Sequence, residues 1–336
     1  MASDNNGFRR ASPLVSVVLS FFNESGVLPE LIARLRSVLR DEQNKGNISG
    51  YELIFVNDAS TDSSVAVLEA EFEAGRDLLI VNMSNNFGVS ECVLAGMNLS
   101  KGDLVIYMDA DLQDPPEVIP ELLLKWHCDP EVEVVYTTRL SREGEHPLKL
   151  LVTHLGYKLI NRISEIELPE NSGDFKLLSR RVVQELLKMR EKKPYLRGLV
   201  TWIGFKQAQV LYHRAERHDG RENTKRPAFS ARTIRYALDS AIISFSDAPL
   251  KAILLLGFCI SFTSLIYIGV VIFQKIMGWY EPGWPALMAA ILLLGGIQLL
   301  MLGFVGLYVN VIFANTKGRP DYIVKNVIAT DERKFP

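Results

Sequence analysis

Three aspartates and a glutamate crowd the segment YMDADLQDPPE, residues 107–117. The segment continues from KGDLVIYM, a run typical of a buried strand, so Asp109, Asp111 and Asp114 gather where the chain leaves a hydrophobic sheet. Like charges at this spacing cost free energy unless a cation lies among them. Carboxylate oxygens are ligands that Mg²⁺ and Mn²⁺ prefer. The segment therefore predicts a divalent-metal site, with a solvated acidic loop as the alternative.

Short apolar strands alternate with amphipathic helices before this segment and just after it. Helical patterns occupy VLPELIARLRSVLR and SVAVLEAEFEA, between runs rich in β-branched residues. We expect strands at 12–22, 51–58, 77–84, 101–109 and 132–138. This alternation predicts an α/β fold with a mostly parallel sheet and helices on both of its faces. Ligands of such sheets bind at the carboxyl ends of the strands.

Polar residues follow four of these strands at the edge where a ligand would bind. They lie in the segments 21–24, 57–62, 84–91 and 109–114. No G-x-G-x-x-G follows the first strand and the chain has no G-K-[ST] loop, so neither a dinucleotide site nor a P-loop is indicated. A diphosphate can instead be held through a divalent ion. One carboxylate of Asp109 and Asp111 would then bind the ion and the other a sugar hydroxyl.

The C-terminal third contains two long uncharged runs. Residues 252–273 read AILLLGFCISFTSLIYIGVVIF, and a longer run extends over 282–316. Either run is long enough to cross a bilayer core of roughly 30 Å. We therefore predict transmembrane helices at about 250–273 and 285–314. A pair of buried helices in a soluble core is the alternative, although such helices rarely stay uncharged on all sides.

The charges around the two runs predict their orientation. Basic residues precede the first run and follow the second, whereas the turn QKIMGWYEPGWP is aromatic and has a single lysine offset by Glu281. We therefore expect a multi-pass protein of the inner (plasma) membrane, with the N-terminal domain and both termini cytoplasmic. Apolar residues at helical spacing in 229–248 predict an amphipathic helix lying at the membrane interface, with a plain surface helix as the alternative.

Composition excludes several classes of protein. The formal net charge is -2 and no block of lysines and arginines occurs, so no nucleic-acid partner is expected. The three cysteines have no metal or redox spacing, which indicates reduced thiols in a reducing compartment. Residues 1–12 are polar, and the apolar run after them is too short and too β-rich for a signal peptide.

Five segments together resemble family 2 glycosyltransferases of the polyprenyl-phosphate and dolichyl-phosphate sugar synthase type. They are VSVVLSFFNE, IFVNDASTD, NNFGVSECVLAGMNLSKGD, IYMDADLQDPPE and SGDFKLLSR. The resemblance covers roughly residues 13–225, and a C-terminal two-helix hairpin is an arrangement of the bacterial members. It implies the GT-A nucleotide-sugar-binding fold, a bound Mg²⁺ or Mn²⁺, and inverting transfer of one sugar to a membrane polyprenyl phosphate.

The resemblance favours UDP-glucose as donor and undecaprenyl phosphate as acceptor. GDP-mannose, UDP-N-acetylglucosamine and a UDP-4-amino-arabinose derivative stay open as donors. A processive polysaccharide synthase would need more membrane spans and a Q-x-x-R-W motif, and the chain has no such motif. A binding protein with an inactive transferase fold would be expected to have lost an aspartate of the site. The sequence leaves a homo-oligomer open.

The resemblance also implies roles for individual residues. Asp58 would bind the nucleotide base, although it precedes Ala59 where many relatives have glycine. The metal ligands would be Asp109, Asp111 and Gln113, and Asp174 would join Asp111 as a catalytic residue. The implied donor-binding residues are Phe21, Asn23, Glu24, Asp58, Asn86, Asp109, Arg217 and Lys225.

Two of these expectations leave alternatives open. Asp174 matches the family's catalytic base, but a lipid phosphate with a second pKa near 6 is mostly dianionic at about pH 7 and needs little base, so Asp174 would then orient the acceptor. It could also be an acid near the N-terminus of a helix. Arg139 and Arg142 are candidates for the acceptor phosphate because guanidinium binds phosphate in bidentate fashion, with ordinary surface arginines as the alternative.

The expected organisation has five parts. They are a flexible N-terminus (1–12), a cytosolic glycosyltransferase domain (13–228), the interfacial helix (229–248), the transmembrane hairpin (249–316) and a cytosolic tail (317–336). Within the domain, Trp202 in GLVTWIGFKQ is expected in the core, with an exposed aromatic surface over an acceptor groove as the alternative.

Overall fold

The computed structural model describes most of the chain in two compact units. The described residues are 12–75, 77–140, 172–189, 191–192, 194–214, 248–279 and 283–330. The first unit contains the described residues up to Arg214 together with the segment from Arg319 onwards. The second runs from Ala248 to Gly318. The interfacial helix was expected at 229–248, and all of this range before Ala248 lies outside the described residues.

The first unit is built on an eight-stranded sheet with the order β7-β5-β6-β4-β1-β2-β3-β8. The strands are β1 (Leu14–Phe21), β2 (Gly50–Asn57), β3 (Leu78–Met83), β4 (Leu104–Asp109), β5 (Val134–Arg139), β6 (Ser172–Ser179), β7 (Gln207–Tyr212) and β8 (Val324–Ile328). Strands β1 to β4 are mutually parallel, and β5 and β7 are parallel to each other. Strands β6 and β8 run antiparallel to their neighbours. The predicted mostly parallel sheet is confirmed.

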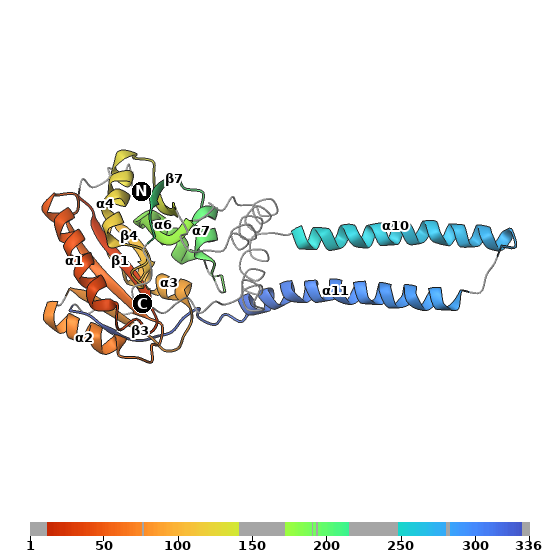
Figure 1. The fold of residues 1–336 in the computed structure, drawn as a ribbon, viewed down its shortest axis with the longest axis horizontal. Coiled ribbons are helices and arrows are strands. Elements are labelled where there is room, and N and C mark those ends of the chain that lie inside the picture. The colour runs from red at the N-terminus through yellow and green to blue at the C-terminus, as the bar shows by residue number, and fades with distance from the viewer. Residues whose placement is uncertain are drawn as a thin grey trace, which may run out of the picture. The chain divides into compact units, whose positions relative to one another are not determined.

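Helices cover both faces of this sheet (Figure 1). One face carries α1 (Leu28–Asn44), α2 (Ser64–Gly75), the short 3-10 helix η1 (Pro116–Val118) and α4 (Ile119–Cys128). The other carries α3 (Val89–Leu99), α6 (Arg180–Lys188) and α7 (Leu196–Trp202). Alternate residues of each strand point to opposite faces, so both faces need apolar residues, and the strands are buried almost throughout.

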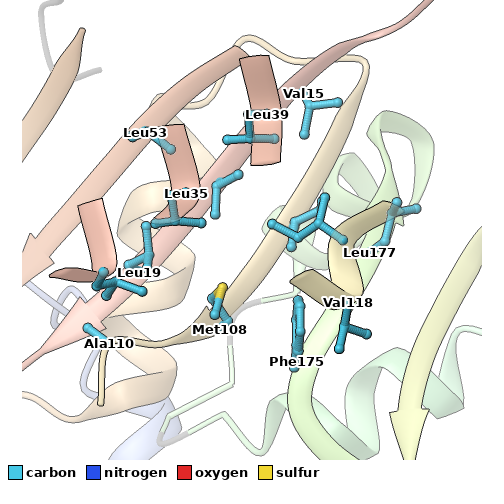
Figure 2. Packing of buried hydrophobic residues seen from close by; sticks show 14 of the residues in the cluster. Val15, Leu19, Leu35, Leu39, Leu53, Met108, Ala110, Val118, Phe175 and Leu177 are labelled. Atoms are coloured by element: carbon cyan, nitrogen blue, oxygen red, sulfur yellow. The ribbon is translucent and has the colours of Figure 1, made fainter. Parts of the chain in front are cut away.

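The main hydrophobic core lies between the sheet and α1, α2 and α4. Figure 2 shows Leu35 and Leu39 of α1 over Leu19 and Val15 of β1, with Met108 of β4 beside them. On the opposite face, α3 approaches the sheet closely at Gly96. A Cβ atom there would lie 2.4 Å from Val18 Cγ1, so only glycine allows this approach.

The segment after the second long helix returns to the sheet as β8, an element that no sequence pattern predicted. Strand β8 pairs with the outer edge of β3, and Ser84 N donates to Ile323 O at 2.9 Å. Lys192 Nζ forms an ion pair with Asp321 Oδ1 at 2.5 Å. An uncovered β3 would present unpaired backbone groups at the sheet edge. The C-terminal segment is therefore part of the folded N-terminal domain and not merely a tail.

The second unit contains two apolar helices, α10 (Ala248–Ile276) and α11 (Trp284–Thr316), which form a hairpin (Figure 1). Each includes a 24-residue segment long and apolar enough to cross a membrane, Ile253–Ile276 and Leu293–Thr316, with mean hydropathies of 2.3 and 2.1. Neither segment is buried within the structure. This exposure favours membrane-spanning helices over two helices in a soluble core. Trp279 lies in the turn and is exposed, as expected of an interfacial aromatic residue.

Candidate active site

The four polar loops predicted from the sequence lie at one edge of the sheet. Parallel pairing aligns Phe21 with Asn57 and Ser20 with Asp109, so β1, β2 and β4 end at the same level. Strand β3 ends beside them, and Asn57 Nδ2 donates to Asn82 Oδ1 at 2.9 Å across the two strands. The carboxyl edge of the sheet is therefore the place where the predicted residues can meet.

The loop after β1 is tied to the loop after β2. Asn23 Oδ1 accepts hydrogen bonds from Thr61 N at 2.8 Å and Asp62 N at 3.2 Å. The backbone N–H of Glu24 donates to Ser64 Oγ at 2.9 Å. The side chain of Phe21 lies in the core, 3 % exposed. Asn23 thus fixes the shape of this edge, whatever else it contacts.

Asp58 connects the loop after β2 to the loop after β3. Its carboxylate is buried and accepts from Phe87 N at 2.7 Å and from Gly88 N at 3.1 Å. Asn86 Nδ2 donates to the backbone carbonyl of Asp58 at 3.2 Å. The structure thus brings together two residues predicted to bind the donor. Carboxylate oxygens have two lone pairs each, so Asp58 keeps acceptor capacity for a ligand.

The acidic loop after β4 alternates between core and surface. Ala110, Leu112 and Asp114 are buried, whereas the predicted metal ligands Asp109, Asp111 and Gln113 are partly exposed. Asp111 Oδ1 accepts from Gln113 N at 3.1 Å. The buried side chains anchor the loop, and the other three residues are left on its accessible side.

Three non-glycine residues of the described chain adopt the left-handed conformation, and all three lie in these loops. They are Asn23 at φ 60°, Ala59 at φ 59° and Leu112 at φ 57°. Such residues cost on the order of 1–3 kcal/mol and cluster at functional sites. Asparagine tolerates the conformation best. Ala59 has a Cβ atom and pays the steric cost of this conformation, which glycine would adopt freely.

Asp174 reaches the same edge on β6, which lies between β4 and β5. The alternative that Asp174 stands at a helix N-terminus is wrong, because α6 begins at Arg180 and its N-cap is Ser179, which accepts from Val182 N at 3.3 Å. Antiparallel pairing of Tyr107 with Lys176 brings the start of β6 to the end of β4. Asp174 is thereby placed near Asp109, as their electrostatic interaction also indicates.

Arg197 of α7 forms a bidentate ion pair with Asp174. Arg197 Nε donates to Asp174 Oδ1 at 2.6 Å, and a second guanidinium nitrogen donates to Oδ2. Burial alone would raise the pKa of Asp174, but Arg197, with smaller effects from Lys176 and Arg139, lowers it below its ordinary value. Asp174 is therefore ionised and held in one orientation.

The charges around Asp109 have the opposite effect. Burial, followed by the negative charges of Asp174, Asp111 and Asp114, raises the pKa of Asp109 to about 7. Burial also lowers the pKa of Lys176, which is 2 % exposed, to about 8 despite the nearby Asp174. Two carboxylates of the same edge thus have pKa values shifted in opposite directions, which is characteristic of functional sites.

Arg139 ends β5 on the other side of the acidic loop. Its Nε donates to Tyr212 Oη at 3.3 Å, and Tyr212 Oη donates to Asp114 Oδ1. Asp114 is fully buried, and Arg214 Nε lies 3.7 Å from its Oδ1. Arg139 is thus part of the cluster and not an ordinary surface arginine. Arg142, Arg217 and Lys225 lie outside the described residues.

Two residues of α7 were not foreseen in their observed roles. Arg197 was missed, although a lone charge in the apolar stretch LRGLVTW is a signal that could have indicated it. Trp202 was expected in the core, and this is wrong, because its side chain is 57 % exposed. The short helix buries Leu196, Leu199 and Val200, which leaves Trp202 beyond the buried stripe.

A divalent ion fits the carboxylates of this edge only if it takes further ligands from elsewhere. Within the part of the chain that the structure describes, no group of three or more histidine, cysteine, aspartate or glutamate residues is arranged to hold a metal. Asp109 and Asp111 supply two carboxylates, and Mg²⁺-type ions usually bind one or two carboxylates together with water and substrate phosphates. The raised pKa of Asp109 is the observation that favours a cation here.

Comparison with known proteins identifies the family. The model of glycosyl transferase family 2 matches residues 16–187, half of the chain. An uncharacterized glycosyltransferase of Synechocystis is 40 % identical over 93 % of this chain and 95 % of its own length. The prophage bactoprenol glucosyl transferase homolog of Escherichia coli is 35 % identical over 93 % of this chain and 99 % of its own length, and the bactoprenol glucosyl transferase of Shigella phage SfV is 34 % identical over 93 % and 98 %.

One solved structure covers nearly the whole chain. The mannosyltransferase of Pyrobaculum calidifontis in complex with GDP-Man and Mn²⁺ is 16 % identical over 91 % of this chain and 87 % of its own, with a TM-score of 0.46. The sheet and its edge of carboxylates define a glycosyltransferase fold of the GT-A type. The chain belongs to glycosyl transferase family 2.

The shifted pKa of Asp109 predicts how stability depends on pH without metal. The Asp109 carboxyl binds its proton more tightly in the folded state than in the unfolded chain. Its contribution to the free energy of unfolding is therefore fully present below about pH 4 and is lost as the pH rises through the folded pKa of about 7. Asp109→Asn should therefore stabilise the protein in EDTA more at about pH 8 than at about pH 5. Thermal melting of both proteins at the two pH values measures this.

Asp62→Asn is the matched control for this measurement. Burial raises the pKa of Asp62, but hydrogen bonds with Ser64 and Ser25 lower it overall. Asp62→Asn should therefore not raise the melting temperature at about pH 8. Equal melting temperatures for Asp109→Asn and the unaltered protein at both pH values would contradict the repulsion at this edge.

Proposed function

We propose that the protein transfers glucose from UDP-glucose to a membrane polyprenyl phosphate, with undecaprenyl phosphate as the acceptor. The observation that carries this proposal is the similarity to proteins named bactoprenol glucosyl transferase, at 33–35 % identity over 93 % of this chain. The cluster of carboxylates and arginines at the sheet edge supports it. A transferase for another nucleotide sugar is the second candidate, because the family motifs do not distinguish donors.

The reaction needs few groups at the acceptor. A phosphate oxygen of the lipid forms a bond to the anomeric carbon of the sugar on the face opposite the diphosphate, the bond from that carbon to the diphosphate breaks, and the configuration inverts. A lipid phosphate is mostly dianionic at about pH 7, so no proton has to be removed. Asp174, ionised and fixed by Arg197, would then orient the acceptor more than act as a base.

The donor would lie across the loops after β1 to β4. Asp58 would bind the base, Asn23, Glu24 and Asn86 would line the nucleotide pocket, and Arg217 and Lys225 would contact the diphosphate. Mg²⁺ or Mn²⁺, held by Asp109, Asp111 and Gln113, would stabilise the diphosphate as it leaves. The raised pKa of Asp109 supports a role in binding a cation.

Arg139 and Arg142 would bind the acceptor phosphate. Arg139 lies in the same cluster as Asp174, since its charge contributes to lowering the pKa of that carboxyl. A guanidinium offers several N–H donors that match the oxygens of a phosphate. The two helices α10 and α11 would anchor the protein in the membrane in which the acceptor lies.

Assay of the purified full-length protein tests this function. Undecaprenyl phosphate in mixed micelles is incubated with a panel of radiolabelled nucleotide sugars and Mn²⁺, and UDP-glucose is expected to give a labelled lipid. Activity should be lost in excess EDTA and in Asp111→Ala, because the carboxylate that holds the cation is gone. Asp41→Ala, on the surface of α1 where Asp41 Oδ2 pairs with Lys45 Nζ at 2.7 Å, should remain active. Full turnover in EDTA would refute the requirement for a metal. Labelling from another nucleotide sugar alone would refute UDP-glucose as the donor.

Replacement of Arg139 tests the acceptor site. Arg139→Ala should raise the apparent KM for undecaprenyl phosphate by roughly ten- to a hundredfold, the effect of losing one charge-assisted contact. The affinity for UDP in the presence of Mn²⁺, measured by calorimetry, should barely change. Arg34→Ala, which removes a surface arginine paired with Glu117 at 2.6 Å, should leave both values unchanged. Weaker UDP binding with an unaltered acceptor KM would assign Arg139 to the diphosphate instead.

The charges that flank α10 and α11 lead us to propose that the catalytic domain and both termini are cytoplasmic, in the inner membrane of a bacterium. A reporter fused after Pro336 should then be cytoplasmic, and one inserted after Gly278, in the turn, should be on the opposite side. Activity of green fluorescent protein and alkaline phosphatase at the two positions measures this. The reversed pattern would overturn the proposed orientation.

A further inference from the structure

A buried chain of polar contacts connects the acidic loop to Arg139. Asp114, 0 % exposed, accepts from the hydroxyl of Tyr212, which is 4 % exposed. That hydroxyl accepts in turn from Arg139 Nε at 3.3 Å. The three residues come from the loop after β4 and from the ends of β7 and β5. Because a hydroxyl has only one hydrogen, its use on Asp114 leaves a lone pair directed to Arg139, which fixes the order of the chain.

This series of polar contacts contains more polar groups than packing of the core requires. A buried carboxylate is costly unless it is paired and hydrogen-bonded, yet Asp114 Oδ2 has no hydrogen-bond partner among the residues that the structure describes. The atom Arg214 Nε, 3.7 Å from Asp114 Oδ1, is buried and also lacks a hydrogen-bond partner within this described part of the chain. A phenylalanine at position 212 would keep the edge-to-face contact with Phe175, whose ring centroid is 6.3 Å away. The hydroxyl is therefore not needed to fill the core.

We propose that Asp114 and Tyr212 are positioning residues that hold Arg139 against the phosphate of the acceptor lipid. The inference rests on the proposed function and deepens it. Tyr212 engages one of the five N–H donors of a guanidinium, so the others can bind phosphate oxygens while the side chain stays fixed. Asp114 ends the same loop that carries Asp111, so one loop sets the positions of both the metal-binding carboxylate and the acceptor arginine.

Removal of the single hydroxyl tests this role. Tyr212→Phe should raise the apparent KM for undecaprenyl phosphate about three- to tenfold, the effect of one hydrogen bond, with kcat and the affinity for UDP unchanged. Tyr51→Phe is the matched control, because Tyr51 Oη also accepts from an arginine Nε, that of Arg40, at 3.3 Å, but at the start of β2. This variant should behave as the unaltered protein.

A double-mutant cycle separates positioning from a merely structural role. If Tyr212 acts through Arg139, Tyr212→Phe should change the acceptor KM of an Arg139→Ala enzyme by less than about twofold. Losses that multiply would overturn the proposal, and so would a fall in UDP affinity in Tyr212→Phe. An unchanged acceptor KM in Arg139→Ala would also overturn the positioning role, but it would not affect the proposed transfer reaction. The transfer reaction is refuted only if no sugar reaches the lipid.

A second variant, Arg139→Lys, tests the same role if Tyr212→Phe folds poorly. Arg139→Lys keeps the positive charge but replaces the planar fork that reaches Tyr212 and a phosphate together. The proposal predicts a rise in acceptor KM of at least the size expected for Tyr212→Phe, with normal UDP binding. An acceptor KM equal to that of the unaltered protein would show that charge alone suffices and that Tyr212 and Asp114 position nothing.

Discussion

Repulsion among carboxylates gathered at one edge of the sheet is the constraint on which the rest of the site depends. One loop brings Asp109, Asp111 and Asp114 there, and β6 adds Asp174. Partly desolvated like charges persist only where cations compensate them. Arg197 compensates Asp174 and the Tyr212 hydroxyl binds Asp114, while Asp109 is left with a pKa near 7. The uncompensated charge thus remains on the carboxylates proposed to hold the donor's cation.

The direction of a single strand makes this gathering possible. Strand β6 lies between β4 and β5 and runs antiparallel to both, so it brings its first residues to the carboxyl edge. A parallel strand in the same place would bring Ser179 there and would carry Asp174 to the opposite end of the sheet. Strands β5 and β7 run parallel to each other and end at Arg139 and Tyr212, side by side in register. The antiparallel strand therefore combines the acidic loop with the arginines.

Sequence patterns could predict what is local along the chain. The strands before residue 140 and the Asp-x-Asp loop are contiguous signals, and the structure has these strands and this loop where they were expected. The apolar run of GDFKLLS fits the start of a helix as well as a strand, and only pairing with β4 decides between them. Arg197 meets Asp174 only once that pairing exists. Strand β8 is five residues long and forms on an edge that the sequence does not reveal.

The opposite pKa shifts of two nearby carboxylates favour a division of labour. Asp174 is ionised and already engaged by Arg197, which makes it a weak base but a well-fixed neighbour for an incoming phosphate. Asp109, with a pKa of about 7, is only partly ionised near that pH, so an approaching cation would favour its charged form. An acceptor that arrives as a dianion needs orientation and positive charge more than it needs proton removal. The arrangement of Asp174, Arg197 and Arg139 matches such an acceptor better than it matches a sugar hydroxyl, whose proton a stronger base would have to take.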